Sequence, residues 1–214
     1  MRPRAALCEM SANTRYLSLT KPLGMVLEER ENGCGAVIES LVSGGAAAES
    51  RAVAPGDVLV KVGETDVQTR AFDEVMEMLV AAPSQVSLAL DDGLGKLDIT
   101  PNLIKSLKPE EAVLADLVVR RAVFEIRAST FAQAELGGLL RVEIVLGAGV
   151  RQDGRCLVRF FGIFSRDGSS TYSCNISATG RRKPDGSIEI LALSCAKDEG
   201  WGQTIDLKRD EQTS

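Results

Sequence analysis

Hydrophobic and polar residues alternate with a period of two in several short stretches of the first half of the chain. Such alternation is typical of β-strands that have one buried face. It predicts five strands, at residues 16–20, 25–29, 35–41, 58–62 and 85–90. Apolar residues at helical spacing predict a longer helix over 72–81, which Pro83 ends, and the small residues at 46–49 predict one further helical turn.

The second half of the chain shows mainly the pattern of strands. Pro109 at a first helical position predicts a short helix over 110–117, with acidic residues in its first turn. Beyond it, alternation separated by Asp-Gly and Gly-rich turns predicts six strands, at residues 123–128, 140–146, 156–164, 171–178, 188–194 and 201–207. We expect an antiparallel β-meander, either a small barrel or a curved sheet, with the one short helix.

A polar, glycine-containing stretch at 91–98 separates the two halves. The expected organisation is an N-terminal extension at 1–13, a first domain at 14–98 and a C-terminal antiparallel β domain at 99–214. The fold class expected for the whole chain is therefore α+β, with mainly β-structure.

Three segments of the first domain carry a resemblance to a known family. They are Lys21-Pro22-Leu23-Gly24-Met25, the small-residue segment at 43–48, and Val53-Ala54-Pro55-Gly56-Asp57-Val58-Leu59-Val60-Lys61-Val62-Gly63. Their order and spacing, together with the order of the predicted elements, resemble the PDZ domain over about residues 14–90. The resemblance implies a partly open β-barrel with two helices.

The resemblance also implies a peptide-binding groove. In PDZ domains the loop that corresponds to Lys21–Met25 holds the carboxylate of a peptide C-terminus, and the peptide adds as an extra strand to the sheet edge. The groove residues implied are Leu23, Gly24, Met25, Val26, Leu27, Phe72, Met76 and Leu79. For the side chains among them, the alternative is that they only fill the core of the domain.

Two residues of this groove depart from the usual PDZ pattern. Phe72 stands at the helix position where a histidine selects Ser or Thr in the ligand, so we expect an apolar ligand side chain two residues before the terminus. Pro22 replaces the first glycine of the loop and has no N–H to donate. The sequence therefore leaves three alternatives open: a peptide C-terminus, an internal strand of a partner, or a groove that has become a buried packing surface.

The composition argues against most catalytic chemistry. The chain has no histidine, which excludes Ser-His-Asp and Cys-His nucleophiles and His-ligated metals. Its glycines form no Walker or Rossmann phosphate-binding motif, and the five cysteines form no C-x-x-C pair. We therefore expect no enzyme activity, no cofactor and no metal site. Cys174 and Cys195 either form a disulfide or remain free thiols.

The net charge of −5 arises in the first hundred residues, which hold 9 Lys and Arg against 15 Asp and Glu. This acidic half argues against nucleic-acid binding and favours a basic surface on a protein partner. The sequence contains no apolar run long enough for a transmembrane segment.

The segment at 21–29 is also similar to PDZ-like segments of algal plastid proteins that accompany thylakoid photosystems. This similarity implies a chloroplast location, in the stroma or on the stromal face of the thylakoid. The function expected is a non-enzymatic scaffold, acting as a peripheral subunit or assembly factor of a membrane-protein complex. The alternative is a carrier of a small hydrophobic ligand or lipid that uses the C-terminal β domain.

Overall fold

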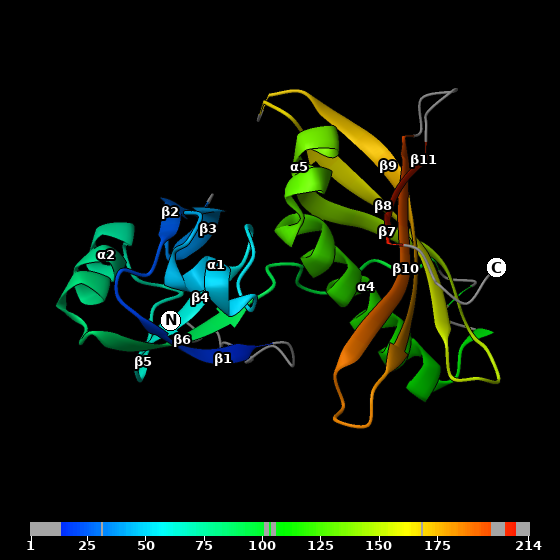
Figure 1. Cartoon of the computed structure of the whole chain (residues 1–214), viewed down its shortest axis with the longest axis horizontal. Helices are drawn as coiled ribbons and strands as arrows, with labels where there is room; N and C mark the ends of the chain where they lie inside the picture. Colours follow the sequence, from blue (N-terminus) through cyan, green and yellow to red (C-terminus); the bar gives the residue numbers. More distant parts are fainter. Residues whose placement is uncertain are drawn as a thin grey trace, which may run out of the picture. The chain divides into compact units, whose positions relative to one another are not determined.

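The computed structural model of the chain describes residues 14–30, 32–100, 103, 106–167, 169–197 and 204–208 (Figure 1). The chain divides into two compact units, Met1–Gly95 and Lys96–Ser214. None of the described helices is both long and apolar enough to cross a membrane.

The first unit is built on an antiparallel sheet. Its strands are β1 (Arg15–Thr20), β2 (Met25–Glu29), β3 (Ala36–Leu41), β4 (Val58–Val62), β5 (Thr65–Asp66) and β6 (Gln85–Asp91). They are ordered β1-β6-β4-β3-β2, with β5 paired to β4, so that β2 lies at an edge of the sheet. The helices are α1 (Ala46–Ser50) and α2 (Phe72–Ala81). The predicted strands and helices of this half, and its mixed α+β character, are confirmed.

Alternation along the strands creates the core of the first unit. Residues of β6 such as Val86 and Leu88 are buried every second position and pack with Val75 and Leu79 of α2 and Ala47 of α1. Burial of these apolar side chains is the main stabilising contribution to the unit.

One charged side chain is buried beside this core. The Asp57 carboxylate, 1% exposed, lies 2.5 Å from the Arg15 guanidinium and accepts the N–H of Ala54 at 2.8 Å. It therefore links β1 to the turn before β4.

We expect Asp57→Ala to lower the free energy of unfolding of the first unit by about 2–3 kcal/mol, because the buried N–H of Ala54 loses its acceptor and Arg15 loses its partner. Asp57→Asn, which keeps an acceptor oxygen without the charge, should cost about half as much. Hydrogen exchange of peptides from residues 15–91 measures the loss; equal exchange in wild type and Asp57→Ala would contradict the prediction.

The second unit combines two helices with a five-stranded antiparallel meander. The helices are α4 (Pro109–Ala128) and α5 (Thr130–Leu136). The strands are β7 (Gly138–Val150), β8 (Cys156–Ser165), β9 (Thr171–Arg182), β10 (Ile188–Lys197) and β11 (Thr204–Lys208), in the order β11-β10-β9-β8-β7. Of the two predicted arrangements, the structure has the curved sheet, which is open with β7 and β11 at its edges.

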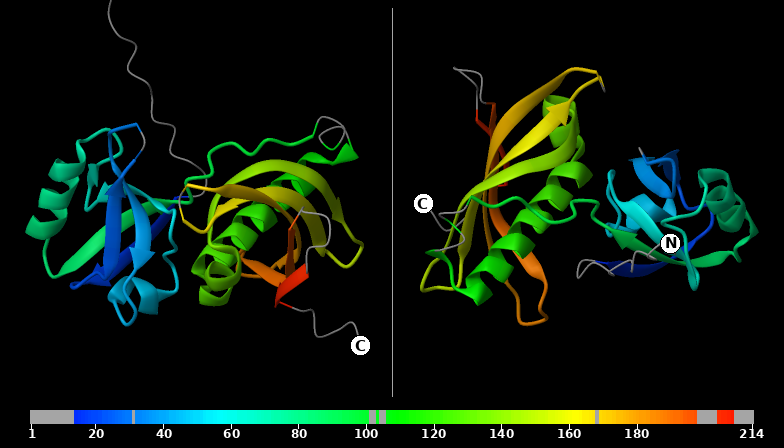
Figure 2. Two further views of the ribbon diagram at one scale, coloured as in Figure 1. Left: turned by 90° about the horizontal axis from the view of Figure 1, so that it is seen from above. Right: turned by 180° about the vertical axis from the view of Figure 1, so that it is seen from behind.

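The strand predicted at 123–128 is wrong, and the predicted helix at 110–117 is too short. Both stretches belong to the twenty-residue helix α4, which the sheet covers along its length (Figure 2). Its buried residues recur at helical spacing and are Ala115, Val118, Val119, Ala122, Val123, Ile126 and Arg127. Helix α5 was not expected from the sequence. The last predicted strand is present as β11 from Thr204, and the first residues predicted for it, 201–203, lie outside the described residues.

Bulges and glycines allow the sheet to bend around α4. The pairing of β7 with β8 shifts register three times, and each such bulge increases the local bend and twist of the strand. At Gly180 of β9, an added Cβ would lie 3.1 Å from a methyl group of Val118 in α4. Glycine at this position therefore lets the helix lie close to the sheet.

Candidate functional site

The loop at 21–24 joins β1 to β2 and is fastened to the C-terminal end of α2. The N–H of Lys21 donates to the carbonyl of Ser84 (2.7 Å). The Lys21 ammonium donates to the carbonyls of Val80 (2.8 Å) and Ala82 (2.5 Å), where a cation is favoured by the helix dipole. Lys21 therefore holds the start of β2 against the end of α2.

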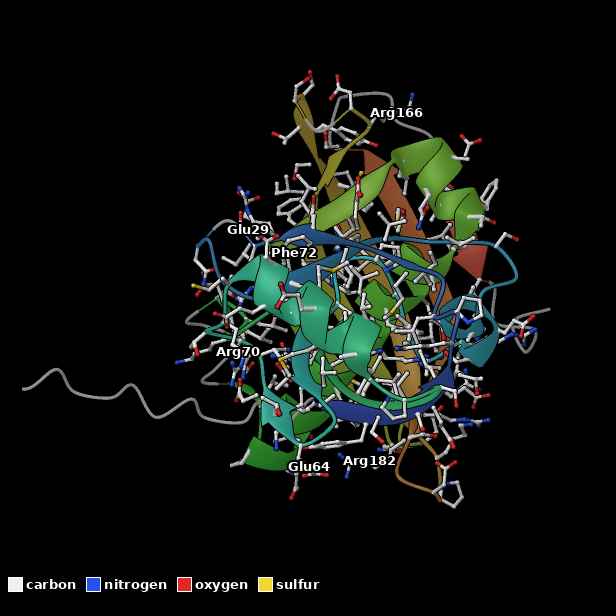
Figure 3. All side chains as sticks on the ribbon, turned by 90° about the vertical axis from the view of Figure 1, so that its left-hand side faces the viewer. Glu29, Glu64, Arg70, Phe72, Arg166 and Arg182 are labelled. Carbon is white, nitrogen blue, oxygen red and sulfur yellow. The ribbon has the colours of Figure 1, made fainter. Side chains whose placement is uncertain are left out.

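The other end of β2 is fastened to the start of α2. Gly35, in the connection from β2 to β3, donates its N–H to the carbonyl of Arg70, two residues before α2 (2.7 Å). With both ends fixed in this way, β2 and α2 run in opposite directions. Figure 3 views the unit from the side of α2, and Phe72 and Glu29 lie at the same end of the helix in this view.

The peptide groups of the loop are oriented by hydrogen bonds to their carbonyls. The carbonyl of Leu23 accepts the N–H of Ala47 (2.9 Å), and the carbonyl of Gly24 accepts the N–H of Val42 (2.9 Å). Because C=O and N–H point in opposite directions across a trans peptide, the N–H groups of Gly24 and Met25 point away from α1 and β3. The loop therefore presents adjacent N–H donors at the open edge of β2.

Two N–H groups of the loop, those of Leu23 and Gly24, are available to an anion. Among the residues that the structure describes, no acceptor is found for the N–H groups of Leu23 and Gly24. Pro22 precedes these groups, so its missing N–H removes none of them. An arrangement of successive N–H groups in one concave loop is suited to binding a carboxylate.

Close contact between two glycines shapes the loop. Gly24 has a φ of +68°, and an added Cβ would lie 2.7 Å from the Cα of Gly45, at the start of α1. The backbone of the loop thus rests directly on the backbone before α1, which fixes its position.

The apolar side chains beside the loop form what we call the β2–α2 surface. It consists of Leu23, Met25, Leu27 and Phe72, all partly exposed and packed against the core of the unit. Two further predicted residues lie on α2: Met76 is 36% exposed, whereas Leu79 is 6% exposed and belongs mainly to the core. Val26 points to the opposite face of β2 from Met25 and Leu27 and is 40% exposed. Val26 therefore lies away from this surface, and Leu79 lies mainly beneath it.

Two residues of the site were not predicted. Lys21 fastens the loop to α2, and Gly45 supports the loop. The roles of Lys21 and Gly45 depend on contacts between segments far apart in the sequence.

The second unit was expected to hold the alternative function, the carriage of a small hydrophobic ligand or lipid. Phe160 and Phe164, on the strand β8, are fully buried. A cavity between α4 and β7, lined by apolar residues including Leu97, Val119 and Val145, has a volume of about 10 Å³, which is the space of a single water molecule. It has no room for a lipid. No group of three or more potential metal ligands is found among the described residues.

The cysteines of the second unit are buried free thiols. Cys174 and Cys195 lie on the neighbouring strands β9 and β10 and form no disulfide with each other. Burial raises the pKa of the Cys195 thiol to about 12 and that of Cys156 to about 11. Both thiols therefore stay protonated near neutral pH and are poor nucleophiles.

Comparison with known proteins identifies the first unit. The sequence model of the PDZ domain family matches residues 15–91. No curated protein sequence matches the chain.

Similar solved structures include two choanoflagellate PDZ domains. One is Dlg1 PDZ2 of Monosiga brevicollis, with 22% identity and a TM-score of 0.34, which covers 36% of this chain and 90% of its own. The other is the PDZ domain of choanoflagellate GIPC, with 23% identity and a TM-score of 0.35, which covers 40% of this chain and 96% of its own. The family match and the confirmed order of strands and helices lead to one conclusion: residues 15–91 of this chain are a PDZ domain.

Proposed function

We propose that this protein is a non-enzymatic scaffold whose PDZ domain captures the free C-terminus of a partner protein. PDZ domains are protein-binding modules, and the observation that carries the proposal is the loop at Leu23–Met25 with its outward N–H groups. Beside it, β2 is an edge strand, so an extended peptide can add to the sheet through main-chain hydrogen bonds.

The β2–α2 surface supports an apolar ligand. Leu23, Met25 and Leu27 present partly exposed apolar side chains from one side of it, and Phe72 does so from α2. A ligand with apolar side chains at its last residue and two residues before it would bury them here. Each such side chain contributes about 1.5–3 kcal/mol when it is fully buried.

Titration of fluorescent peptides into the full chain tests this function. A peptide ending in Lys-Arg-Val-Ser-Val should bind with a free carboxylate and lose at least about tenfold in affinity when its C-terminus is amidated. Leu23→Asp and Met76→Asp should weaken binding, because they place a carboxylate beside the ligand. Tyr16→Asp, at an exposed position of β1, is the matched control and should leave binding unchanged.

Two results would overturn the function. One is equal binding of the free and amidated peptides. The other is unchanged binding to both Asp variants.

The setting of this protein in the cell is a further part of the proposal. We infer a partner in a thylakoid membrane-protein complex, with this protein as a peripheral subunit or assembly factor on the stromal face. The support is the similarity of the segment at 21–29 to PDZ-like segments of algal plastid proteins. Fractionation of cells that express the tagged protein tests it, since recovery outside plastids would exclude this setting.

A further inference from the structure

The two ends of the β2–α2 surface differ in electrostatic character. At the start of β2, the outward N–H groups of Gly24 and Met25 favour an anion. At the end of β2, Glu29 is exposed on the face of Met25 and Leu27, and Glu28 is exposed on the opposite face of the strand, with Val26. Asp73 is exposed in the first turn of α2. One end therefore attracts negative charge and the other attracts positive charge.

The three residues at the acidic end are carboxylates. Within the described part of the chain, the side chains of Glu28, Glu29 and Asp73 neither form an ion pair nor accept a hydrogen bond. The nearby Arg70 pairs with Glu74 (3.5 Å).

Two further cations near the surface are Lys21 and Arg30. Lys21 is bound to the carbonyls at the opposite end of α2. The Arg30 side chain lies against Gly35, where its Cδ is 3.3 Å from the position of an added Cβ.

The direction of a bound peptide follows from the position of the N–H groups. A ligand whose carboxylate lies at Gly24 and Met25 must extend from there along β2 toward Glu29, so it runs antiparallel to β2. Paired strands advance by nearly the same distance per residue, about 3.3 Å. The ligand residues three and four positions before the terminus therefore lie level with Glu28 and Glu29.

We propose that the ligand of this PDZ domain carries Lys or Arg three to four residues before its C-terminal carboxylate, paired with Glu28, Glu29 and Asp73. The proposal rests on the proposed function, because it places the ligand carboxylate in the loop at Leu23–Met25. Complementary charge at both ends fixes the direction and register of the peptide as well as adding affinity.

Three peptides with free carboxylates test the proposal on the full chain. They end in Lys-Arg-Val-Ser-Val, Ala-Ala-Val-Ser-Val and Glu-Glu-Val-Ser-Val, and fluorescence anisotropy measures their affinity in 50 mM and 500 mM NaCl. We expect the Lys-Arg peptide to bind about tenfold more tightly than the Glu-Glu peptide in low salt, with the Ala-Ala peptide between them. The difference should fall to about twofold in high salt, because these charges are exposed and screened.

A charge-reversed variant locates the effect. Glu28→Lys should remove most of the preference for the Lys-Arg peptide and leave the Ala-Ala peptide bound as before. Glu64→Lys is the matched control, since Glu64 is exposed in the turn between β4 and β5, on the other side of α2 from Glu29 in Figure 3.

The outcomes separate the two proposals. If all three peptides bind equally well, the charge preference is refuted and the peptide-binding function stands. If Glu64→Lys removes the preference as strongly as Glu28→Lys, the assigned location is refuted. If none of the three peptides binds, the proposed function itself fails.

Discussion

Gly137→Ala is expected to unfold the second unit, with a loss of about 4 kcal/mol or more in the free energy of unfolding. Gly137 joins α5 to β7 with a φ of +73°, and an added Cβ would lie 2.2 Å from the carbonyl oxygen of Ser165. The neighbouring backbone cannot move aside easily, because Tyr172 donates its hydroxyl to the carbonyl of Leu136 and Arg166 donates to the carbonyl of Glu135. The end of α5 is thus fixed against the end of β8 and the start of β9.

Gly154→Ala is the matched control for this prediction. Gly154 also has a positive φ, +78°, but an added Cβ would meet no atom within 4 Å. Gly154→Ala should lower the free energy of unfolding only through backbone strain, by about 1–2 kcal/mol. Hydrogen exchange of peptides from 109–197 measures both variants, and equal stability of the two would show that the contact at Ser165 does not matter.

Gly24→Ala is expected to reduce the affinity for a C-terminal peptide by about thirtyfold or more while the PDZ domain remains folded. The added Cβ would lie 2.7 Å from the Cα of Gly45, so the loop has to move away from α1. This movement turns the N–H groups of Gly24 and Met25 out of position. A thirtyfold loss of affinity corresponds to a loss of about 2 kcal/mol in binding free energy, which is the contribution of one or two charge-assisted hydrogen bonds.

Gly44→Ala separates this effect from simple strain. Gly44 has a φ of +75° and open space around an added Cβ, and it lies directly beside Gly45. It should lower stability slightly without changing peptide affinity. If Gly24→Ala binds the free-carboxylate peptide as tightly as Gly44→Ala does, the loop is not the carboxylate site.

The sequence predicted the first unit well because its signals are local. Strand alternation, the turn at Pro55-Gly56-Asp57 and the helical spacing from Phe72 to Leu79 each act within a few residues. The same locality revealed the loop at Lys21–Met25. Gly45 supports that loop and Lys21 binds the end of α2, and both contacts join segments far apart in the chain. No local pattern in the sequence therefore indicates them.

The main error, in α4, has a physical cause. The stretch Val123-Phe124-Glu125-Ile126-Arg127-Ala128 alternates like a strand over six residues. In α4 the buried residues Val118, Val119, Ala122, Val123 and Ile126 recur at helical spacing and form one apolar stripe. This stripe is visible only over a segment longer than six residues, and the prediction divided the segment into a short helix at 110–117 and a strand at 123–128.

The enclosure of α4 also bears on how the second unit forms during synthesis. The helix emerges from the ribosome before all five strands that follow it in the chain, and β8, β9 and β10 supply much of its apolar cover. Until β10 has been made, its contacts with α4 are missing, and apolar surface on the helix stays in contact with water. This unit can therefore fold completely only when contacts between distant segments have formed. Such a topology is associated with slow folding, and partly folded chains of this kind are prone to aggregate or to bind chaperones.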